Sequence, residues 1–498
     1  GGSIDNLDGA SITGDQVGVG TFYESADITN SGGATITGTN NDGIYFAAGG
    51  TLLNTGAGSL IKGGWNGVRL EGGGTVTNED GAEIQGGQGT SAAAIYLPDG
   101  GTVSNGRGSR IVGDSSAGTY GIYMSNDGTV SNAGTIIGDV RLADQRENHV
   151  TLFTGSHIEG DLYISVLDDD STLTLDGDGT QLYSAAVSGA TTFVQGGTLI
   201  KTGSGTWIMD TDEQGIAPDA VMIEQGTLDT RHYDSVVLGG FFTIPQALSA
   251  ATVTIKDGAL LLGDGLIGGL VVQSGAIVAP GHSTGTLTIA GDYQPVSGSI
   301  YEAQVSGDGT SDLIDASGAA TIAAGAELKA SKYGAMPLTV GTVYTVLTAH
   351  SVTGTYTVLD DGALTAFLKA DASYDSKHAY LTVAQSRDLV AAATTPNQRA
   401  AAAGLQSTPS GNAARVAVLN LPDDAAAAAA FDSLSGEIHA SLRGALPLDA
   451  RAPREAALDR LRIALSHGAE IWSRTYGALG HVASDGNGAA IDNRTGGF

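Results

Sequence analysis

Residues that could catalyse a reaction are few in this sequence, and their surroundings do not suit catalysis. The nine histidines show neither the HExxH spacing nor any other metal-ligand spacing, and no segment has the strand, GxSxG turn and helix of a nucleophile elbow. Gly113-Asp114-Ser115 has the order found at the start of GDS lipases, but it lacks the α/β surroundings that such a site needs. Asp139, Arg141 and Arg146 come nearest to the mixed charges of a polysaccharide-cleaving groove. We therefore predict that the protein is not an enzyme.

An acidic run at residues 168–170 raises the alternative of a calcium site. The run has no closing Glu, as an EF-hand would, and it is not part of a calcium-binding nonapeptide repeat. A solvated turn is the favoured interpretation. We predict no metal and no cofactor.

Aromatic and guanidinium side chains form a pattern better suited to recognition. Tyr45, Arg69, Tyr96 and Tyr123 occupy the same place in a repeating unit, each between apolar neighbours as in Ile44-Tyr45-Phe46. Alternation of this kind is typical of a strand that buries its apolar residues and points the intervening residue outward. The same register places Thr21 at the start of the row. The alternative is that stacked aromatics only stabilise neighbouring strands.

The unit that carries this row is a repeat of three short strands. An apolar-x-Asn motif recurs at spacings of 24, 24, 27 and 27 residues, which is a solenoid period. It occurs at Ile28-Thr29-Asn30, Leu52-Leu53-Asn54, Val76-Thr77-Asn78, Val103-Ser104-Asn105 and Val130-Ser131-Asn132. An Ile-x-Gly motif and the aromatic motif follow in each unit. The sequence therefore predicts an all-β, right-handed parallel β-helix of 24–27-residue coils, in which the Asn residues form a hydrogen-bonded ladder.

The longer coils gain residues at one place, between the second and third strands. Both insertions, at residues 87–91 and 114–118, should stack on one edge of the helix. Insertions that map to one face of a solenoid often mark its binding face. This adds Gln88, Thr90, Asp114, Ser115 and Ser116 to the candidate partner-binding residues.

Composition and charge fit this architecture and limit its partners. The chain has 76 Gly, no Cys and a formal net charge of −30, which suits a turn-dense β protein and argues against nucleic acid as a partner. The absence of Cys fits a protein that crosses oxidising compartments unfolded. Ile4-Asp5-Asn6 lies 24 residues before Asn30, so we expect the N-terminus to be processed or trimmed.

Motifs in the second half resemble those of a known family. Residues 197–207 read GTLIKTGSGTW, residues 223–228 read IEQGTL, and residues 278–289 read VAPGHSTGTLTI, followed by further matching segments at 311–314 and 343–349. These segments are similar to the passenger-associated repeat and the autochaperone cap of bacterial autotransporters, the type V secreted proteins, of the pertactin and AIDA-like branch. The resemblance implies that cap formation and folding involve Gly203, Gly205, Trp207, Pro280, Gly281 and Ser283. Trp207, Tyr301 and Tyr344 are expected to pack inside the cap.

The C-terminal part changes to an Ala-rich composition with helical spacing. Pro396 and Asn397 are set to start a helix, and residues 424–442 and 454–471 have apolar residues at helical intervals. The family resemblance implies a linker and junction helix here, then the truncated start of a translocator β-barrel. We therefore expect four parts: β-helix passenger coils at 1–196, the C-terminal β-helix with its cap at 197–385, the linker and junction helix at 386–470, and the barrel start at 471–498.

The resemblance also implies where the protein works. An autotransporter passenger reaches the outer membrane through the periplasm and is displayed on the bacterial surface or released. Its expected role is non-catalytic binding of host surface or serum proteins, as an adhesin or in the capture of host defence proteins. In the full precursor, its own translocator barrel is a further partner. The alternatives are self-association of cells and, less favoured, a polysaccharide-active enzyme. No Arg-Gly-Asp tripeptide is present to support integrin binding.

Overall fold

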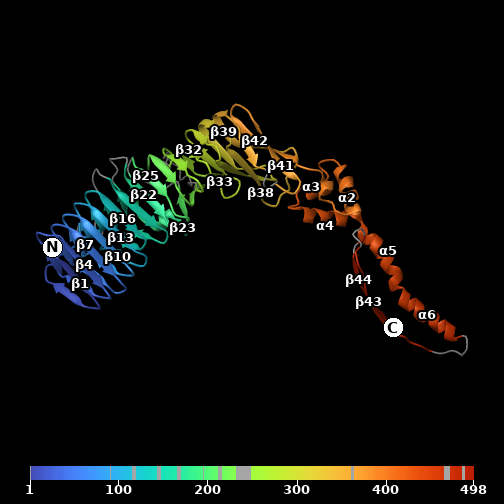
Figure 1. The fold of residues 1–498 in the computed structure, drawn as a ribbon, viewed down its shortest axis with the longest axis horizontal. Helices are drawn as coiled ribbons and strands as arrows, with labels where there is room; N and C mark the ends of the chain where they lie inside the picture. The colour runs from blue at the N-terminus through green and yellow to red at the C-terminus, as the bar shows by residue number, and fades with distance from the viewer. Residues whose placement is uncertain are drawn as a thin grey trace, which may run out of the picture.

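The computed structural model is mostly β-strand and forms one long parallel solenoid. It describes residues 2–89, 91–114, 119–142, 147–164, 170–193, 196–210, 216–231, 248–359, 364–464, 471–484, 488 and 490–498. The solenoid has about 12 turns with about 24 residues in each coil, and a few helices follow it (Figure 1). The prediction of an all-β parallel solenoid with a helical C-terminal tail is confirmed.

In the first half, each coil contributes one strand to each of three sheets. The first sheet contains β1 (Ser3–Asn6), β4 (Ala26–Ser31), β7 (Gly50–Thr55), β10 (Gly74–Glu79), β13 (Gly101–Asn105), β16 (Gly128–Asn132), β19 (His149–Phe153) and β22 (Thr172–Asp176). The second contains β2 (Ser11–Gly14), β5 (Thr35–Gly38), β8 (Leu60–Gly63), β11 (Glu83–Gln85), β14 (Arg110–Val112), β17 (Thr135–Ile137) and β20 (His157–Glu159). The third contains β3 (Val19–Thr21), β6 (Ile44–Phe46), β9 (Val68–Leu70), β12 (Ala93–Leu97), β15 (Tyr120–Met124), β18 (Asp139–Leu142), β21 (Leu162–Ile164) and β24 (Thr191–Phe193).

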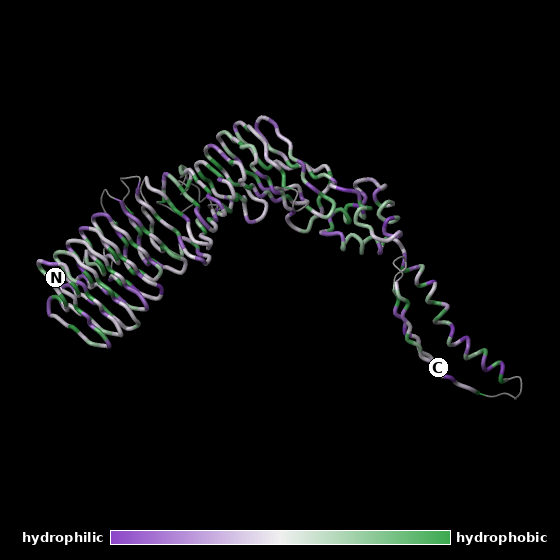
Figure 2. The backbone as a smooth tube through the Cα atoms, in the orientation of Figure 1, coloured by the Kyte–Doolittle hydropathy of each residue, from purple (hydrophilic) through white to green (hydrophobic). Residues whose placement is uncertain are grey.

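The core is the inward half of each strand. Residues alternate along the strands, so that in β6 the side chains of Ile44 and Phe46 are fully buried and that of Tyr45 is half-buried. Figure 2 shows hydrophobic and hydrophilic residues alternating around the coils. Because one coil cannot enclose its apolar residues alone, this core exists only where coils stack.

The expected asparagine ladder runs along the first sheet. Each side-chain amide donates to the next asparagine's oxygen at 2.8 or 2.9 Å, in the order Asn6, Asn30, Asn54, Asn78, Asn105 and Asn132. The ladder ends where Leu152 pairs with Asn132. Two coils later, Lys201 occupies the same register position beside Leu175. The ladder satisfies buried polar groups that would otherwise lack partners.

In the second half, the strands gather into two hydrogen-bonded sheets, and the number of strands in a coil varies between two and three. A short helix, α1 (Tyr183–Ala186), lies at the transition, where the second and third sheets end. The first sheet continues in β25 (Thr198–Lys201), β27 (Ala220–Ile223), β29 (Thr252–Ile255), β31 (Leu266–Ile267), β32 (Gly269–Val272), β34 (Thr286–Ile289), β35 (Tyr293–Pro295), β37 (Leu313–Thr321) and β39 (Val343–Thr353). The opposite sheet contains β23 (Thr180–Leu182), β26 (Thr206–Asp210), β28 (Thr227–Arg231), β30 (Leu260–Gly263), β33 (Ile277–Pro280), β36 (Ile300–Ser306), β38 (Glu327–Tyr333) and β40 (Thr357–Leu359). A coil can still contribute three strands here, since the 17 residues from Leu260 to its partner Ile277 contain β30, β31 and β32.

Antiparallel strands and helices close the solenoid. β42 (His378–Gln385) pairs antiparallel with both β39 and β41 (Leu368–Tyr374), so parallel stacking stops there. The 3-10 helix η1 (Leu389–Ala392) and the helices α2 (Pro396–Gln406), α3 (Ala413–Leu419) and α4 (Asp424–Ser435) follow at that end (Figure 1). α2 starts at Pro396 as predicted, with a Thr395 capping box.

The expected helix over 424–442 is divided in two. Gly436 adopts φ of +72° and ends α4, after which α5 (Glu437–Asp449) begins. α6 (Arg451–Ala464) follows, and β43 (Tyr476–Val482) and β44 (Ile491–Gly497) form an antiparallel hairpin. Among the described helices, none combines the length and the apolar character that a membrane-crossing helix requires.

Candidate binding surface

Six outward side chains from successive coils form a continuous row on the third sheet, which we call the Tyr/Arg row. Strand pairing aligns Tyr45, Arg69, Tyr96, Tyr123, Arg141 and Tyr163 in that order. The structure thus brings together the four residues singled out from the sequence. The expected place of Thr21 is wrong by one residue, because Gly20 pairs with Tyr45 and Thr21 pairs with Phe46.

Two members of the row were not predicted as such: Tyr163 was not singled out, and Arg141 was considered only as part of a possible polysaccharide-cleaving groove. The repeat becomes irregular after Gly138, so it did not show that these two residues continue the row. The usable signal was local: Val140-Arg141-Leu142 and Leu162-Tyr163-Ile164 keep the apolar-x-apolar alternation of Ile44-Tyr45-Phe46.

Stacking holds the row in a defined arrangement. The Arg69 guanidinium carbon lies 5.6 Å from the Tyr45 ring centroid and 5.4 Å from that of Tyr96. The Tyr96 and Tyr123 rings are nearly parallel, with centroids 5.3 Å apart. Burial raises the pKa of the Tyr96 hydroxyl, and the neighbouring Tyr123 adds to this shift, so the hydroxyl stays neutral and can donate a hydrogen bond. Rings fixed in this way lose little freedom when a partner binds.

The two arginines of the row differ in charge compensation. Arg69 forms an ion pair with Glu71. Arg141 lies 4.7 Å from the Tyr163 ring centroid, and within the described part of the chain its guanidinium forms no hydrogen bond or ion pair. Arg141 therefore presents an uncompensated positive charge on a strongly acidic protein.

Further aromatic residues widen the row at two places. Phe22 and Tyr23 are 66% and 93% exposed, and the Phe22 ring centroid is 5.7 Å from that of Tyr45. Tyr120 touches Tyr123, with centroids 5.1 Å apart. The result is an aromatic surface with embedded positive charge.

The insertion edge lies at the corner between the second and third sheets, and it borders a groove of about 670 Å³. Gln88 and Asp114 line this groove. The other lining residues include one from the end of each of five successive strands of the second sheet: Lys62, Gln85, Val112, Ile137 and Glu159. Its floor is backbone, and a Cβ on Gly87 would lie 1.9 Å from the carbonyl oxygen of Gly64. The candidates Thr90, Ser115 and Ser116 lie outside the described residues.

The motif around Gly203, Gly205 and Trp207 lies in the interior and turns of the two-sheet region. Trp207 is fully buried, and its indole N–H donates to the carbonyl oxygen of Asp176 at 2.9 Å. The buried Lys201 ammonium donates to the carbonyl oxygens of Thr202, Gly203 and Gln225 at 2.5, 2.8 and 3.0 Å. Burial lowers the pKa of Lys201 to about 8. These contacts tie successive turns together and leave no access for a partner.

The second cap motif, with Pro280, Gly281 and Ser283, lies at the end of β33. Between them, the His282 ring nitrogen Nε2 is 2.8 Å from Oδ2 of Asp229, whose side chain is 3% exposed.

One coil further, Asp312 accepts hydrogen bonds from the backbone N–H groups of Gly285 and Gln304. Burial raises its pKa to about 7.

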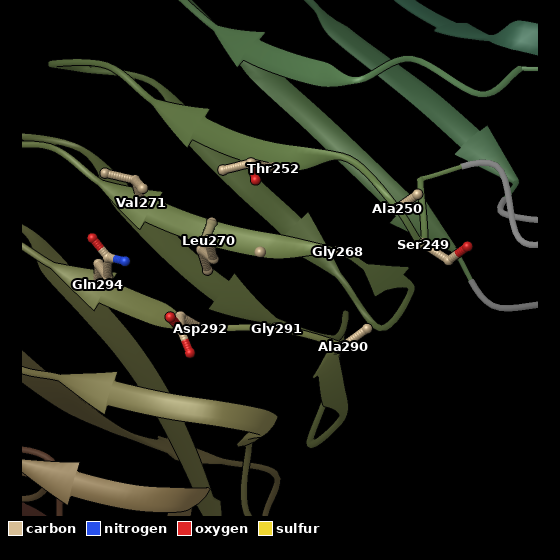
Figure 3. A pocket seen from close by; sticks show the side chains of 11 residues that line it. Ser249, Ala250, Thr252, Gly268, Leu270, Val271, Ala290, Gly291, Asp292 and Gln294 are labelled. Atoms are coloured by element: carbon tan, nitrogen blue, oxygen red, sulfur yellow. The ribbon is translucent and has the colours of Figure 1, made fainter. Parts of the chain in front are cut away.

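A second depression, of about 400 Å³, lies on the first sheet of the two-sheet region (Figure 3). Thr252, Asp292 and Gln294 are its main polar lining residues. The Asp292 carboxylate already accepts from the backbone N–H of Ala319 at 2.8 Å. The depression therefore offers no convergent set of free functional groups.

Across the described residues, no three His, Cys, Asp or Glu side chains gather closely enough to hold a metal ion. Neither a comparison with models of protein families nor one with curated proteins finds a match to this sequence. The case for a function therefore depends on the geometry of this surface.

Proposed function

We propose that this protein is a non-catalytic binding protein that recognises a host surface or serum protein through the Tyr/Arg row. The observation that carries the proposal is the row itself, with six aligned side chains from six consecutive coils. Tyrosine and arginine are enriched among the residues that dominate protein interfaces. Large flat rings with few rotamers give contact area at low entropic cost.

The wider setting of the proposal is that of an autotransporter passenger, displayed on the bacterial surface or released from it. Its support is the resemblance of the segments at 197–207, 223–228 and 278–289, together with the solenoid fold. In that setting, the role would be adhesion or capture of host defence proteins, with the translocator as a partner in the precursor. The net charge of −30 disfavours nucleic acid.

Self-association is the second candidate, and the order of the row favours considering it. The sequence of residue types, Tyr-Arg-Tyr-Tyr-Arg-Tyr, reads the same in both directions. In two antiparallel copies related by a twofold axis, this order places Tyr opposite Tyr, which favours ring stacking, and Arg69 opposite the other copy's Arg141, which opposes it, so self-association ranks second. Sedimentation velocity over a range of concentrations separates this candidate from host binding.

The test is affinity capture from host serum and from a cell-surface extract. The parent chain is compared with a variant carrying Tyr45→Ala, Tyr96→Ala and Tyr123→Ala, and with Tyr333→Ala as a control, since Tyr333 is 41% exposed on β38, outside the row. We expect a protein that the parent and the control retain and the triple variant loses, and that binds the parent saturably once purified. Equal retention by all three chains would refute the proposal.

A further inference from the structure

We propose that the groove beside the insertions is a second binding site, for a neutral, unbranched oligosaccharide. This site uses the corner between the second and third sheets and does not depend on the Tyr/Arg row. Four features of the groove support this ligand class: its length, its free polar groups, an aromatic edge and its charge.

The groove crosses five successive coils. Strand pairing aligns Lys62, Gln85, Val112, Ile137 and Glu159 along it, one residue from each coil. Four steps at the strand spacing of about 4.8 Å give a length of about 19 Å. Each pyranose ring of an extended chain advances by a similar distance, so successive rings would meet successive coils. The backbone floor leaves room for a chain of rings to lie flat.

The polar side chains at one end have unused hydrogen-bonding capacity. In the residues described here, the side chains of Lys62, Gln85 and Gln88 form no hydrogen bond or ion pair with the rest of the chain. Lys62 and Gln85 are register neighbours on β8 and β11, and Gln88 projects from the first insertion. A glutamine amide donates and accepts at once, which suits the paired hydroxyl groups of a sugar. The insertion therefore supplies one polar wall of the groove.

Trp65 provides a flat apolar surface at the same end. Its side chain is 39% exposed, and it adjoins Gly64, which lines the groove. Gly89 of the insertion lies so close that an added Cβ would be 2.7 Å from the ring. The insertion thus fixes the indole beside the polar residues. An aromatic face next to amide groups is the combination that binds the apolar CH face of a sugar ring while its hydroxyls are hydrogen-bonded.

Charge selects a neutral sugar over an anionic one. The groove lining contains one cation, Lys62, against the carboxylates of Asp114 and Glu159. The whole chain carries −30, so a sulfated or uronic acid chain would be repelled as it approached. Val112 and Ile137 in the middle leave an apolar section that suits ring faces.

The experiment is a calorimetric titration of the full chain with chitotetraose, cellotetraose and maltotetraose, and with a heparin tetrasaccharide as the anionic probe. We expect saturable binding of at least one neutral tetrasaccharide and none of the heparin fragment. The Gln85→Ala, Gln88→Ala double variant should bind that sugar at least tenfold more weakly. Gln294→Ala, an exposed glutamine on β35 outside this groove, is the matched control and should bind like the parent.

Tryptophan fluorescence gives a second readout that does not depend on the glutamine variants. The parent's emission should change on titration with the bound sugar, and the change should be lost in Trp65→Phe. Three results would each overturn the proposal: no binding of any neutral tetrasaccharide, preferential binding of the heparin fragment, or equal affinity of the double variant and the parent. The row variant with three alanines should keep its sugar affinity, so failure of this proposal and failure of host-protein binding are distinguishable.

Discussion

Removal of one asparagine from the middle of the ladder is the sharpest test of how the solenoid is held together. The Asn78 side chain donates to Asn105 Oδ1 at 2.9 Å and to the carbonyl oxygens of Ala82 and Arg110 at 3.2 and 3.0 Å. It also accepts from Asn54 at 2.8 Å. All of these groups lie in or beside the buried core.

Asn78→Ala should destabilise the protein by about 3 kcal/mol, because the two amide protons, shared among three acceptors, and the accepted bond are each worth about 1 kcal/mol and their partners stay buried. The remaining contact of Asn54 with the carbonyl oxygen of Glu83, at 2.9 Å, limits the loss at that residue. Asn126→Ala is the matched control. The Asn126 amide makes only two long hydrogen bonds near the surface, to the Pro98 carbonyl oxygen at 3.3 Å and to the Asp99 carboxylate at 3.4 Å.

The assay is guanidinium unfolding followed by circular dichroism, with the midpoint compared among the parent, Asn78→Ala and Asn126→Ala. Solenoids can unfold in parts, so hydrogen exchange at β10 and β13 should be measured alongside. A midpoint for Asn78→Ala equal to that of Asn126→Ala would refute the idea that the ladder stabilises the coils.

Three further predictions concern charge. The pKa of Lys201 is about 8 in the folded chain and 10.5 in the unfolded chain, so the unfolded chain binds more protons between these two values. The free energy of unfolding should therefore rise by about 3 kcal/mol from pH 8 to 10.5, and Lys201→Met should lose this slope in urea unfolding at several pH values. The pKa of Asp312 is about 7 in the folded chain and 3.8 in the unfolded chain, so the folded chain keeps this proton to a higher pH. The free energy of unfolding should therefore fall by as much as about 4 kcal/mol from pH 4 to 7, and an unchanged slope in Asp312→Asn would contradict this. Arg141→Gln should weaken host-protein binding about tenfold and reduce its salt dependence, whereas Arg69→Gln should have a smaller effect because Glu71 already neutralises Arg69. Equal effects of the two substitutions, in binding titrations at two salt concentrations, would contradict the assignment of Arg141 as the free charge.

The sequence was most informative where local alternation alone decides the structure. The positions of Asn30, Asn54 and Asn78 in a repeat were enough to predict the period, the stacking and the ladder. The alternation around Tyr45 was enough to place it outward. Both follow from the two-residue period of a strand, which needs no knowledge of distant contacts.

Features that depend on turn placement or on tertiary contacts were less predictable. The change from three sheets to two arises because strands such as β31 and β32 join the same sheet, which depends on strand pairing and cannot be seen in the sequence. The break at Gly436 needs a left-handed backbone conformation that an isolated glycine in an Ala-rich stretch does not specify. Lys201, buried at an asparagine's register position, was not foreseen because one of its carbonyl partners, Gln225, lies in the next coil.

The measurement that tests the central claim most directly is an equilibrium titration of the captured host protein, after purification, against the parent chain and the row variants. We predict saturable one-to-one binding to the parent. Affinity should be more than a hundredfold lower for the Tyr45→Ala, Tyr96→Ala, Tyr123→Ala chain, since truncated interface residues of this kind can each cost 2 kcal/mol or more. Tyr333→Ala should bind like the parent. Equal affinities for all three chains would contradict recognition through the Tyr/Arg row.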